Sequence, residues 1–103
     1  MTDKTLSVLL VDDHLMVREG LAFIINRDPG MKVVGECGDG LRVCQMAQQL
    51  DPDVVVLDIE MPGLNGLDVC RELTRKFKSL RVLMLTMHDD EHFVVRAIQA
   101  GAA

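Results

Sequence analysis

Four short apolar runs recur along the chain, and each has about the length of a β-strand. Three of them lack a regular alternation with polar residues, which is typical of strands buried on both faces of a parallel sheet. The remaining run, KVVGEC, which is the second along the chain, mixes polar and apolar residues, as is typical of a strand at the edge of a sheet. The predicted strands are Leu6 to Val11, Lys32 to Cys37, Asp53 to Leu57 and Arg81 to Leu85.

Helical spacing fills the intervals between these runs. Apolar residues recur three or four positions apart, so that each set lies on one face of a helix with polar residues outward. The four sets are Val17, Leu21, Ile24 and Ile25; Val43, Met46, Ala47 and Leu50; Leu67, Cys70, Leu73 and Phe77; and Val94, Ala97, Ile98 and Gly101. Breaks such as DPG, GDG and DPD separate the elements. The β-α-β-α-β-α-β-α order predicts one α/β domain with an open parallel sheet.

Composition narrows the classes of function. The chain has 103 residues, enough for one domain with a real core, and its net charge is −5. A net acidic surface argues against gripping DNA or an anionic membrane directly. No signal peptide or run long enough to span a bilayer is present, and the odd count of three cysteines predicts reduced, mostly buried thiols in the cytoplasm.

Acidic residues follow the predicted strands at the edge where ligands bind in such sheets. Asp12 and Asp13 end the first strand, Asp58 ends the third and Thr86 follows the fourth. If these strands are neighbours, their carboxyl ends bring the four side chains to one crevice. The apolar run VVVLD is then a buried strand that presents Asp58 at the rim of the sheet.

Two interpretations of the acids compete. If only the pair Asp12 and Asp13 is considered, the favoured interpretation is that they cap the helix that starts near Leu15. A third acid from a separate strand favours a divalent cation, because crowded carboxylates repel and Mg²⁺ prefers oxygen ligands. A carboxylate held in this way either ligates a metal for hydrolysis or attacks phosphorus to form an aspartyl phosphate, with Thr86 suited to bond a phosphoryl oxygen.

The chain resembles a bacterial response-regulator receiver domain. The similar segments are VLLVDDH at 8–14, VVGECGDG at 33–40, DPDVVVLDIEMPGLNGLD at 51–68, RVLMLT at 81–86 and AIQAGA at 97–102, and they follow the family's order over essentially the whole chain. The DDH, VVGE and MPGLNGLD segments are closest to the NarL/FixJ (LuxR-type) subfamily of transcription regulators. The resemblance implies a flavodoxin-like, three-layer αβα fold with strand order 2-1-3-4.

The resemblance also implies roles for single residues. Asp58 is the expected phosphoacceptor, which takes its phosphoryl group from a sensor histidine kinase. Asp13 and Asp58 are expected to ligate Mg²⁺, with Asp12 helping through water and Glu60 through its backbone carbonyl. Thr86 is expected to be the switch hydroxyl that moves toward the phosphoryl group and draws the 90–101 helix with it.

Other residues receive no role. Met61-Pro62-Gly63 is expected only to shape the loop beside the site. His14, His88 and His92 are expected to be ordinary solvated surface or loop residues.

One departure from the family's pattern lies at the end of the sequence. The family continues into a fifth strand that ends in a Lys and then a fifth helix, and this subfamily adds a DNA-binding output domain. Residues 1–103 are therefore expected to be an incomplete receiver domain that lacks that Lys and contacts DNA only through an absent domain. A bare fourth strand is expected to favour a homodimer or other self-association.

Three other classes of function stay open. The first is an interaction module that is not phosphorylated and whose acids are vestigial. The second is a Mg²⁺-dependent phosphohydrolase with Asp58 as nucleophile, although the sequence offers no obvious general acid beside it. The third, a flavin-binding α/β domain, is disfavoured because DDH would repel FMN where a phosphate-binding loop is needed.

Overall fold

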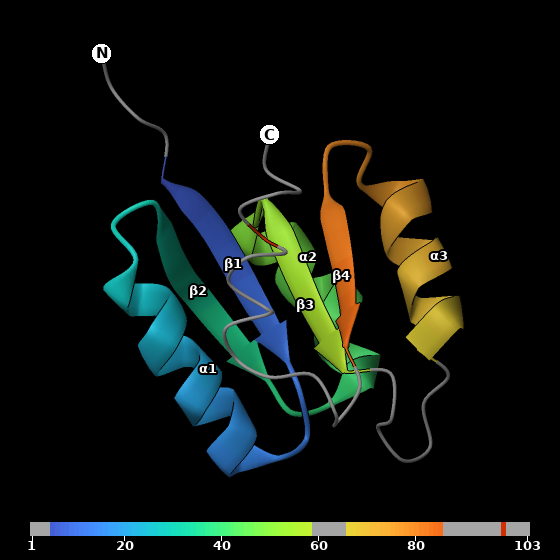
Figure 1. The fold of residues 1–103 in the computed structure, drawn as a ribbon. Coiled ribbons are helices and arrows are strands. Elements are labelled where there is room, and N and C mark those ends of the chain that lie inside the picture. Colours follow the sequence, from blue (N-terminus) through green and yellow to red (C-terminus); the bar gives the residue numbers. More distant parts are fainter. Residues whose placement is uncertain (1–4, 59–65, 86–97, 99–103) are drawn as a thin grey trace.

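The computed structural model describes residues 5–58, 66–85 and 98 of the chain. Strands and helices alternate within these residues, as the apolar pattern predicts (Figure 1). The strands are β1 (Leu6–Val11), β2 (Met31–Cys37), β3 (Val54–Asp58) and β4 (Arg81–Leu85). The helices are α1 (Leu15–Arg27), α2 (Val43–Leu50) and α3 (Gly66–Lys76), with a short 3-10 turn, η1 (Gly40–Arg42), before α2.

All four strands run parallel in one sheet with the order β2-β1-β3-β4. This is the predicted order, and β2 lies at an edge of the sheet as its mixed polarity indicates. The register pairs Val11 with both Cys37 and Leu57, and Leu57 in turn with Met84. One row of residues therefore crosses all four strands just before their carboxyl ends.

Alternate residues of the central strands bury themselves on opposite faces of the sheet. On one face, Val8, Leu10, Val54 and Val56 pack with Leu21, Ala22 and Ile25 of α1. On the other, Leu9, Val11, Val55 and Leu57 pack with Val43 and Ala47 of α2 and Leu73 of α3. Figure 1 shows the resulting three layers, with α1 on one side of the sheet and α2 and α3 on the other. Unbroken apolar strands follow because both faces are covered.

Most of the described apolar positions that the helical spacing predicts are buried or partly buried. Leu21 and Ile25 of α1 are buried, but Val17 is 46 % exposed, so the predicted stripe on this helix is wrong at its first position. The fourth predicted helix, 90–101, lies outside the described residues except for Ile98, which is helical and buried in the same core as α1. Among the described helices none is long and apolar enough to cross a membrane.

The cysteines agree with the prediction of core thiols. Cys37 is buried, Cys44 and Cys70 are partly buried, and all three are unpaired. They pack into the apolar cluster between the sheet and the α2/α3 layer.

Two local features stabilise the backbone near the amino ends of β1 and β3, at the opposite end of the strands from Asp12 and Asp58. Ser7 of β1 donates hydrogen bonds from its amide and its hydroxyl to Asp53 Oδ2, at 2.9 and 3.1 Å, just before β3 begins. Asp51 follows α2 in the left-handed conformation, with φ 48° and ψ 56°, and its amide bonds the Ala47 carbonyl at 2.9 Å. The α2–β3 connection is therefore tightly specified.

Candidate functional site

The register of the sheet brings two acids from distant parts of the sequence to one edge. Val11 pairs with Leu57, so Asp12 and Asp58 are the next residues on two neighbouring strands. The amide of Asp12 also bonds the Cys37 carbonyl at 3.0 Å, which holds Asp12 in line with β2. Convergence at the carboxyl edge is the arrangement that the strand pattern predicts.

The convergence produces a compact cluster of four side chains at this edge. It consists of Asp12, Asp13, His14 and Asp58, and one possible ligand atom from each lies within 4.8 Å of every other. Asp58 and Asp12 are buried, with 4 % and 8 % of each residue exposed. The side chain of Asp13 is 29 % exposed. The cluster is thus anchored in the sheet and open to solvent on the side of Asp13.

The turn between β1 and α1 depends on Asp12. Its Oδ1 accepts a hydrogen bond from the amide of His14 at 2.8 Å, two residues on, which closes an Asx turn. His14, rather than either acid, occupies the N-cap position of α1, and no side-chain capping bond forms there. The alternative that Asp12 and Asp13 serve only as helix caps is therefore wrong.

His14 differs most from its expected role. Its Nδ1 lies 3.1 Å from Asp12 Oδ1, 3.1 Å from Asp13 Oδ1 and 3.8 Å from Asp58 Oδ2, although 42 % of the side chain stays exposed. The hydrogen bond with Asp12, followed by the charge of Asp13, raises the pKa of His14 above its ordinary value. His14 is a partly exposed residue of the β1–α1 turn, as predicted, but its ring also contacts the acids, which the sequence pattern did not indicate.

Arg18 was also missed at the level of the sequence. Its Nη1 donates to the backbone carbonyl of Asp12 at 2.6 Å, and its Nε donates to Glu36 at 3.1 Å. Gly38 lies beside it, and a Cβ there would come within 2.8 Å of the Arg18 Nη1. Arg18 therefore ties α1 to the ends of β1 and β2, immediately behind the acidic cluster.

Two predicted site residues, Glu60 and Thr86, lie outside the described residues. The Met61-Pro62-Gly63 loop, His88 and His92, for which no direct role is predicted, lie outside them as well. The register places Asp58 opposite Leu85, which is the residue before Thr86. Of the predicted site, the structure therefore describes Asp12, Asp13 and Asp58, and it brings these three together.

The donor set suits a hard divalent cation. Three carboxylates from two strand ends offer oxygen ligands, and Mg²⁺ binds through one or two carboxylates while keeping several waters. Asp13 faces solvent and leaves room for such waters, whereas Asp58 is enclosed. We conclude that Asp12, Asp13 and Asp58 fit a magnesium ion.

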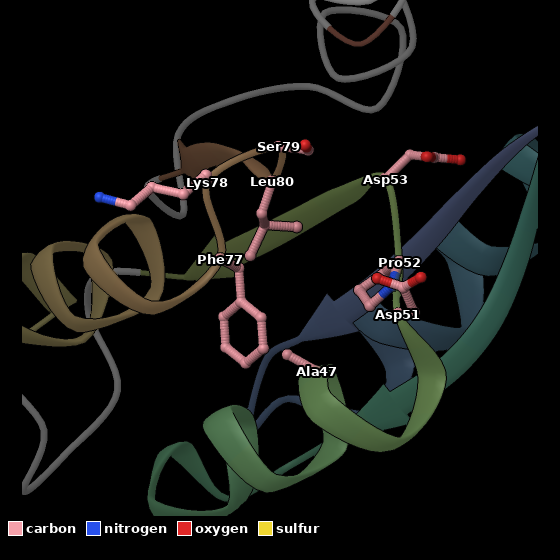
Figure 2. A pocket seen from close by; sticks show the side chains of 8 residues that line it. All are labelled: Ala47, Asp51, Pro52, Asp53, Phe77, Lys78, Ser79 and Leu80. Atoms are coloured by element: carbon pink, nitrogen blue, oxygen red, sulfur yellow. The ribbon is translucent and has the colours of Figure 1, made fainter.

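A separate hollow lies near the amino end of β3. It has a volume of about 340 Å³ and is lined by Ala47, Asp51, Pro52, Asp53, Phe77, Lys78, Ser79 and Leu80. Figure 2 shows Phe77 and Leu80, from the segment that leads from α3 to β4, directed toward Ala47 near the end of α2. Asp53 precedes β3 and Asp58 ends it, so this hollow is separate from the acidic cluster.

Comparison with known proteins identifies the same family that the sequence resembles. Residues 8–103 match the family described as the response regulator receiver domain. The nitrate/nitrite response regulator protein NarL of Escherichia coli K12 is 40 % identical over 96 residues, which cover 93 % of this chain and 44 % of NarL. The chain spans less than half the length of the curated relatives that it matches.

Solved structures of response regulators share this fold. A LuxR-family two-component response regulator from Aurantimonas sp. SI85-9A1 superposes with a TM-score of 0.76 and 37 % identity, covering 95 % of this chain and 70 % of that one. RcsB from Salmonella enterica serovar Typhimurium, solved bound to the promoter rprA with the phosphomimetic BeF3-, has a TM-score of 0.76 and 29 % identity. That match covers 84 % of this chain and 44 % of RcsB.

Proposed function

This chain belongs to the response regulator receiver domain family, and we propose that it accepts a phosphoryl group on Asp58. One observation carries the proposal: the carboxylate of Asp58, buried at the end of β3, shares a cluster with Asp12 and Asp13. A buried acid surrounded by other acids is poorly suited to a purely structural role, since its charge is costly to bury. It is well suited to hold a cation and present an oxygen nucleophile.

The proposed step exchanges one bond to phosphorus for another. An oxygen of Asp58 attacks the phosphoryl group of a phosphohistidine on a sensor kinase. The phosphorus–nitrogen bond breaks as the phosphorus–oxygen bond forms, and the departing imidazole takes up a proton. The products are an aspartyl phosphate on this chain and an unmodified histidine on the kinase.

We assign the magnesium ligands to Asp13 and Asp58, with Asp12 acting through water and Glu60 through its backbone carbonyl. When bound, Mg²⁺ supplies positive charge that offsets the charge of the phosphoryl oxygens. Thr86 is proposed as the hydroxyl that bonds a phosphoryl oxygen and shifts the segment after it. The roles of Glu60 and Thr86 rest on their positions in the sequence.

A signalling role follows from this chemistry. Receiver domains are signalling domains rather than classical enzymes. A doubly charged group added to a buried acid changes the local electrostatics and biases a two-state segment. We propose that the segment after β4 is this element, and that the domain is a phosphoacceptor of the cytoplasm rather than a phosphohydrolase.

The proposed partners follow from the family and from the charge of the chain. A sensor histidine kinase supplies the phosphoryl group, and a second copy of the receiver domain is the proposed partner after phosphorylation. RcsB has been solved bound to promoter DNA. With a net charge of −5, the present domain is not suited to bind DNA itself. We therefore propose that DNA binding belongs to an output domain outside residues 1–103.

The proposal is tested by intact-protein mass spectrometry after incubation with acetyl phosphate, with and without Mg²⁺. The parent protein is compared with Asp58→Asn and with the matched control Asp68→Asn, which changes an exposed acid on α3. Circular dichroism confirms that each variant is folded. We expect one phosphoryl group on the parent and on Asp68→Asn only when Mg²⁺ is present, and none on Asp58→Asn.

Two results would contradict the proposal. Equal uptake by Asp58→Asn would move the phosphoacceptor to another residue. No uptake by the folded parent protein in Mg²⁺ would favour the alternative of an interaction module that is not phosphorylated.

A further inference from the structure

The segment from the middle of α3 to the start of β4 is strongly basic, although the chain as a whole is acidic. Residues 71–81 hold five of the eleven Lys and Arg residues and one acid, Glu72, which gives a net charge of +4. The rest of the chain holds six basic and fifteen acidic residues, which gives a net charge of −9. Because screening limits the reach of a charge to about 8 Å at physiological salt, such a segment attracts anions locally.

The basic side chains of this segment face solvent. They form a basic patch that consists of Arg71, Arg75, Lys76, Lys78 and Arg81, all of them exposed. Arg71 pairs with Asp68 at 3.5 Å, and Lys76 pairs with Glu72 at 3.4 Å, both along α3. Among the residues that the structure describes, no acid forms an ion pair with Arg75, Lys78 or Arg81. The patch therefore offers cations to a carboxylate, which Arg binds through two parallel hydrogen bonds.

The hollow near the amino end of β3 adjoins the basic patch. Lys78 belongs to the patch and also lines this hollow, which has a volume of about 340 Å³. Ala47 and Leu80 are buried apolar residues of its lining. In Figure 2 the ring of Phe77 is directed toward Ala47, whereas the side chain of Lys78 extends away from it. Space for an apolar side chain thus lies directly beside exposed cations.

This combination fits one class of partner. We propose that the basic patch and the hollow bind a short acidic segment of another protein, with carboxylates on Arg75 and Lys78 and one apolar side chain in the hollow. Asp51 and Asp53 line the hollow on the β3 side and repel further acids there, which sets the direction of the segment. DNA extends well beyond the patch and also meets the acidic remainder of the domain, so a compact acidic segment is favoured.

The inference is tested by nuclear magnetic resonance of the isotope-labelled protein during titration with a synthetic peptide. The probe is Glu-Glu-Asp-Phe-Ser-Gly with both ends capped. In one comparison peptide Lys replaces the three acids, and in the other Gly replaces the Phe. We expect the probe to shift the amide signals of residues 71–81 and of the hollow. We expect each comparison peptide to bind at least about tenfold more weakly.

Charge-reversal variants locate the binding surface. Arg75→Glu/Lys78→Glu reverses two charges of the basic patch, and the matched control Lys32→Glu/Arg42→Glu reverses two exposed charges on β2 and η1. Both variants have the same net charge, so a difference between them reports position. We expect the first to weaken binding of the probe at least about tenfold and the control to stay within about threefold of the parent.

Circular dichroism confirms that each variant is folded at the temperature of the titration. If the charge-reversal variant of the patch is unfolded, Arg75→Gln/Lys78→Gln, which only removes the charges, takes its place. We expect this variant to weaken binding of the probe at least about threefold.

Three results would overturn the inference. The first is that the folded parent does not bind the probe at millimolar concentration. The second is that the patch variant binds the probe as tightly as the parent. The third is tighter binding, through the same residues, of a short DNA duplex or of equimolar phosphatidylserine and phosphatidylcholine vesicles, which would assign the patch to nucleic acid or lipid. The inference is independent of the proposed function, because Asp53 precedes β3 and Asp58 ends it.

Discussion

The guanidinium of Arg18 donates a hydrogen bond of 2.6 Å to the backbone carbonyl of Asp12. Arg18 thus contacts the acidic cluster through the main chain, not through a carboxylate. Its second bond, at 3.1 Å to Glu36, fixes the guanidinium against the end of β2. We interpret Arg18 as a positioning residue that holds the backbone of Asp12 and Asp13 in place and thereby orients their side chains.

Replacing Arg18 is therefore expected to weaken metal binding without removing a ligand. Arg18→Met keeps the apolar stem but loses the bond to Asp12, and residues that orient metal ligands typically contribute 10- to 100-fold in affinity. We expect Mg²⁺ affinity to fall by about tenfold at the lower end of that range. Titration calorimetry at a temperature where every variant is folded gives the dissociation constants.

The control is Glu36→Gln, which weakens the other bond of Arg18 and leaves its bond to Asp12 in place. We expect Glu36→Gln to bind Mg²⁺ like the parent and Arg18→Lys to recover part of the affinity. Unchanged Mg²⁺ binding by Arg18→Met would show that the contact serves only the fold.

The contact of Ser7 with Asp53 should matter for stability and not for the site. Asp53 Oδ2 accepts from the Ser7 amide and hydroxyl at the opposite edge of the sheet. Asp53→Ala leaves these donors without that acceptor, so we expect the free energy of unfolding to fall by about 1–3 kcal/mol. Ser7→Ala removes only the hydroxyl and should cost about 1 kcal/mol. Urea unfolding measures both values.

A double-mutant cycle checks the interpretation of this contact. The Ser7→Ala/Asp53→Ala double variant should lose less stability than the sum of the single losses, because both substitutions remove one shared contact. Strict additivity would mean that the two side chains do not interact in solution.

The thiol of Cys44 is expected to be slow to react. Burial, followed by its hydrogen bond of 3.1 Å to the Glu72 carboxylate, raises the pKa of Cys44 above the usual thiol value. The thiolate is the reactive form, so alkylation should begin only at higher pH than for an ordinary thiol. Glu72→Gln removes the negative charge and should lower the pKa of Cys44, which increases its alkylation rate near pH 8 several-fold.

Mass spectrometry of peptides after iodoacetamide treatment follows Cys44 separately from the other two cysteines. Asp68→Asn, on the same helix, serves as the matched control and should leave the rate unchanged. The same thiol bond, followed by the charge of Lys76, lowers the pKa of Glu72. Its contribution to stability is therefore present above the ordinary Glu pKa and lost as the pH falls through the lowered value. A Cys44 rate that Glu72→Gln does not change would argue against the contact.

Asp51 occupies a backbone conformation that restricts what may replace it. Its φ of 48° lies in the left-handed region, where a β-branched side chain is strained. Asp51→Val should lower the free energy of unfolding by about 1–2 kcal/mol. Asp51→Gly, which adopts this conformation readily, should stay within about 1 kcal/mol of the parent. Equal losses in the two variants would show that the Asp51 carboxylate, not its backbone, matters.

Much of the fold could be predicted from local pattern. The observed strands β1 and β4 have the predicted bounds, β2 begins one residue earlier than predicted, and β3 is shifted by one residue at both ends. Such agreement is expected because an unbroken apolar run indicates a strand that is covered on both faces. Apolar residues spaced three or four apart indicate a helix that is buried on one face. Val17 is an exception: it has the right spacing, but it lies in the first turn of α1, where Leu15 and Met16 are exposed as well.

The sequence by itself therefore determined the order of elements, the parallel sheet and the three acids that end its strands. Only the tertiary structure decided that His14 faces those acids and that Arg18 supports Asp12 from behind. The physical reason is that both relationships join residues through a turn and across strand ends. Periodicity reports which side of one element is buried, whereas these contacts depend on the register between strands and on the direction in which the turn aims each side chain.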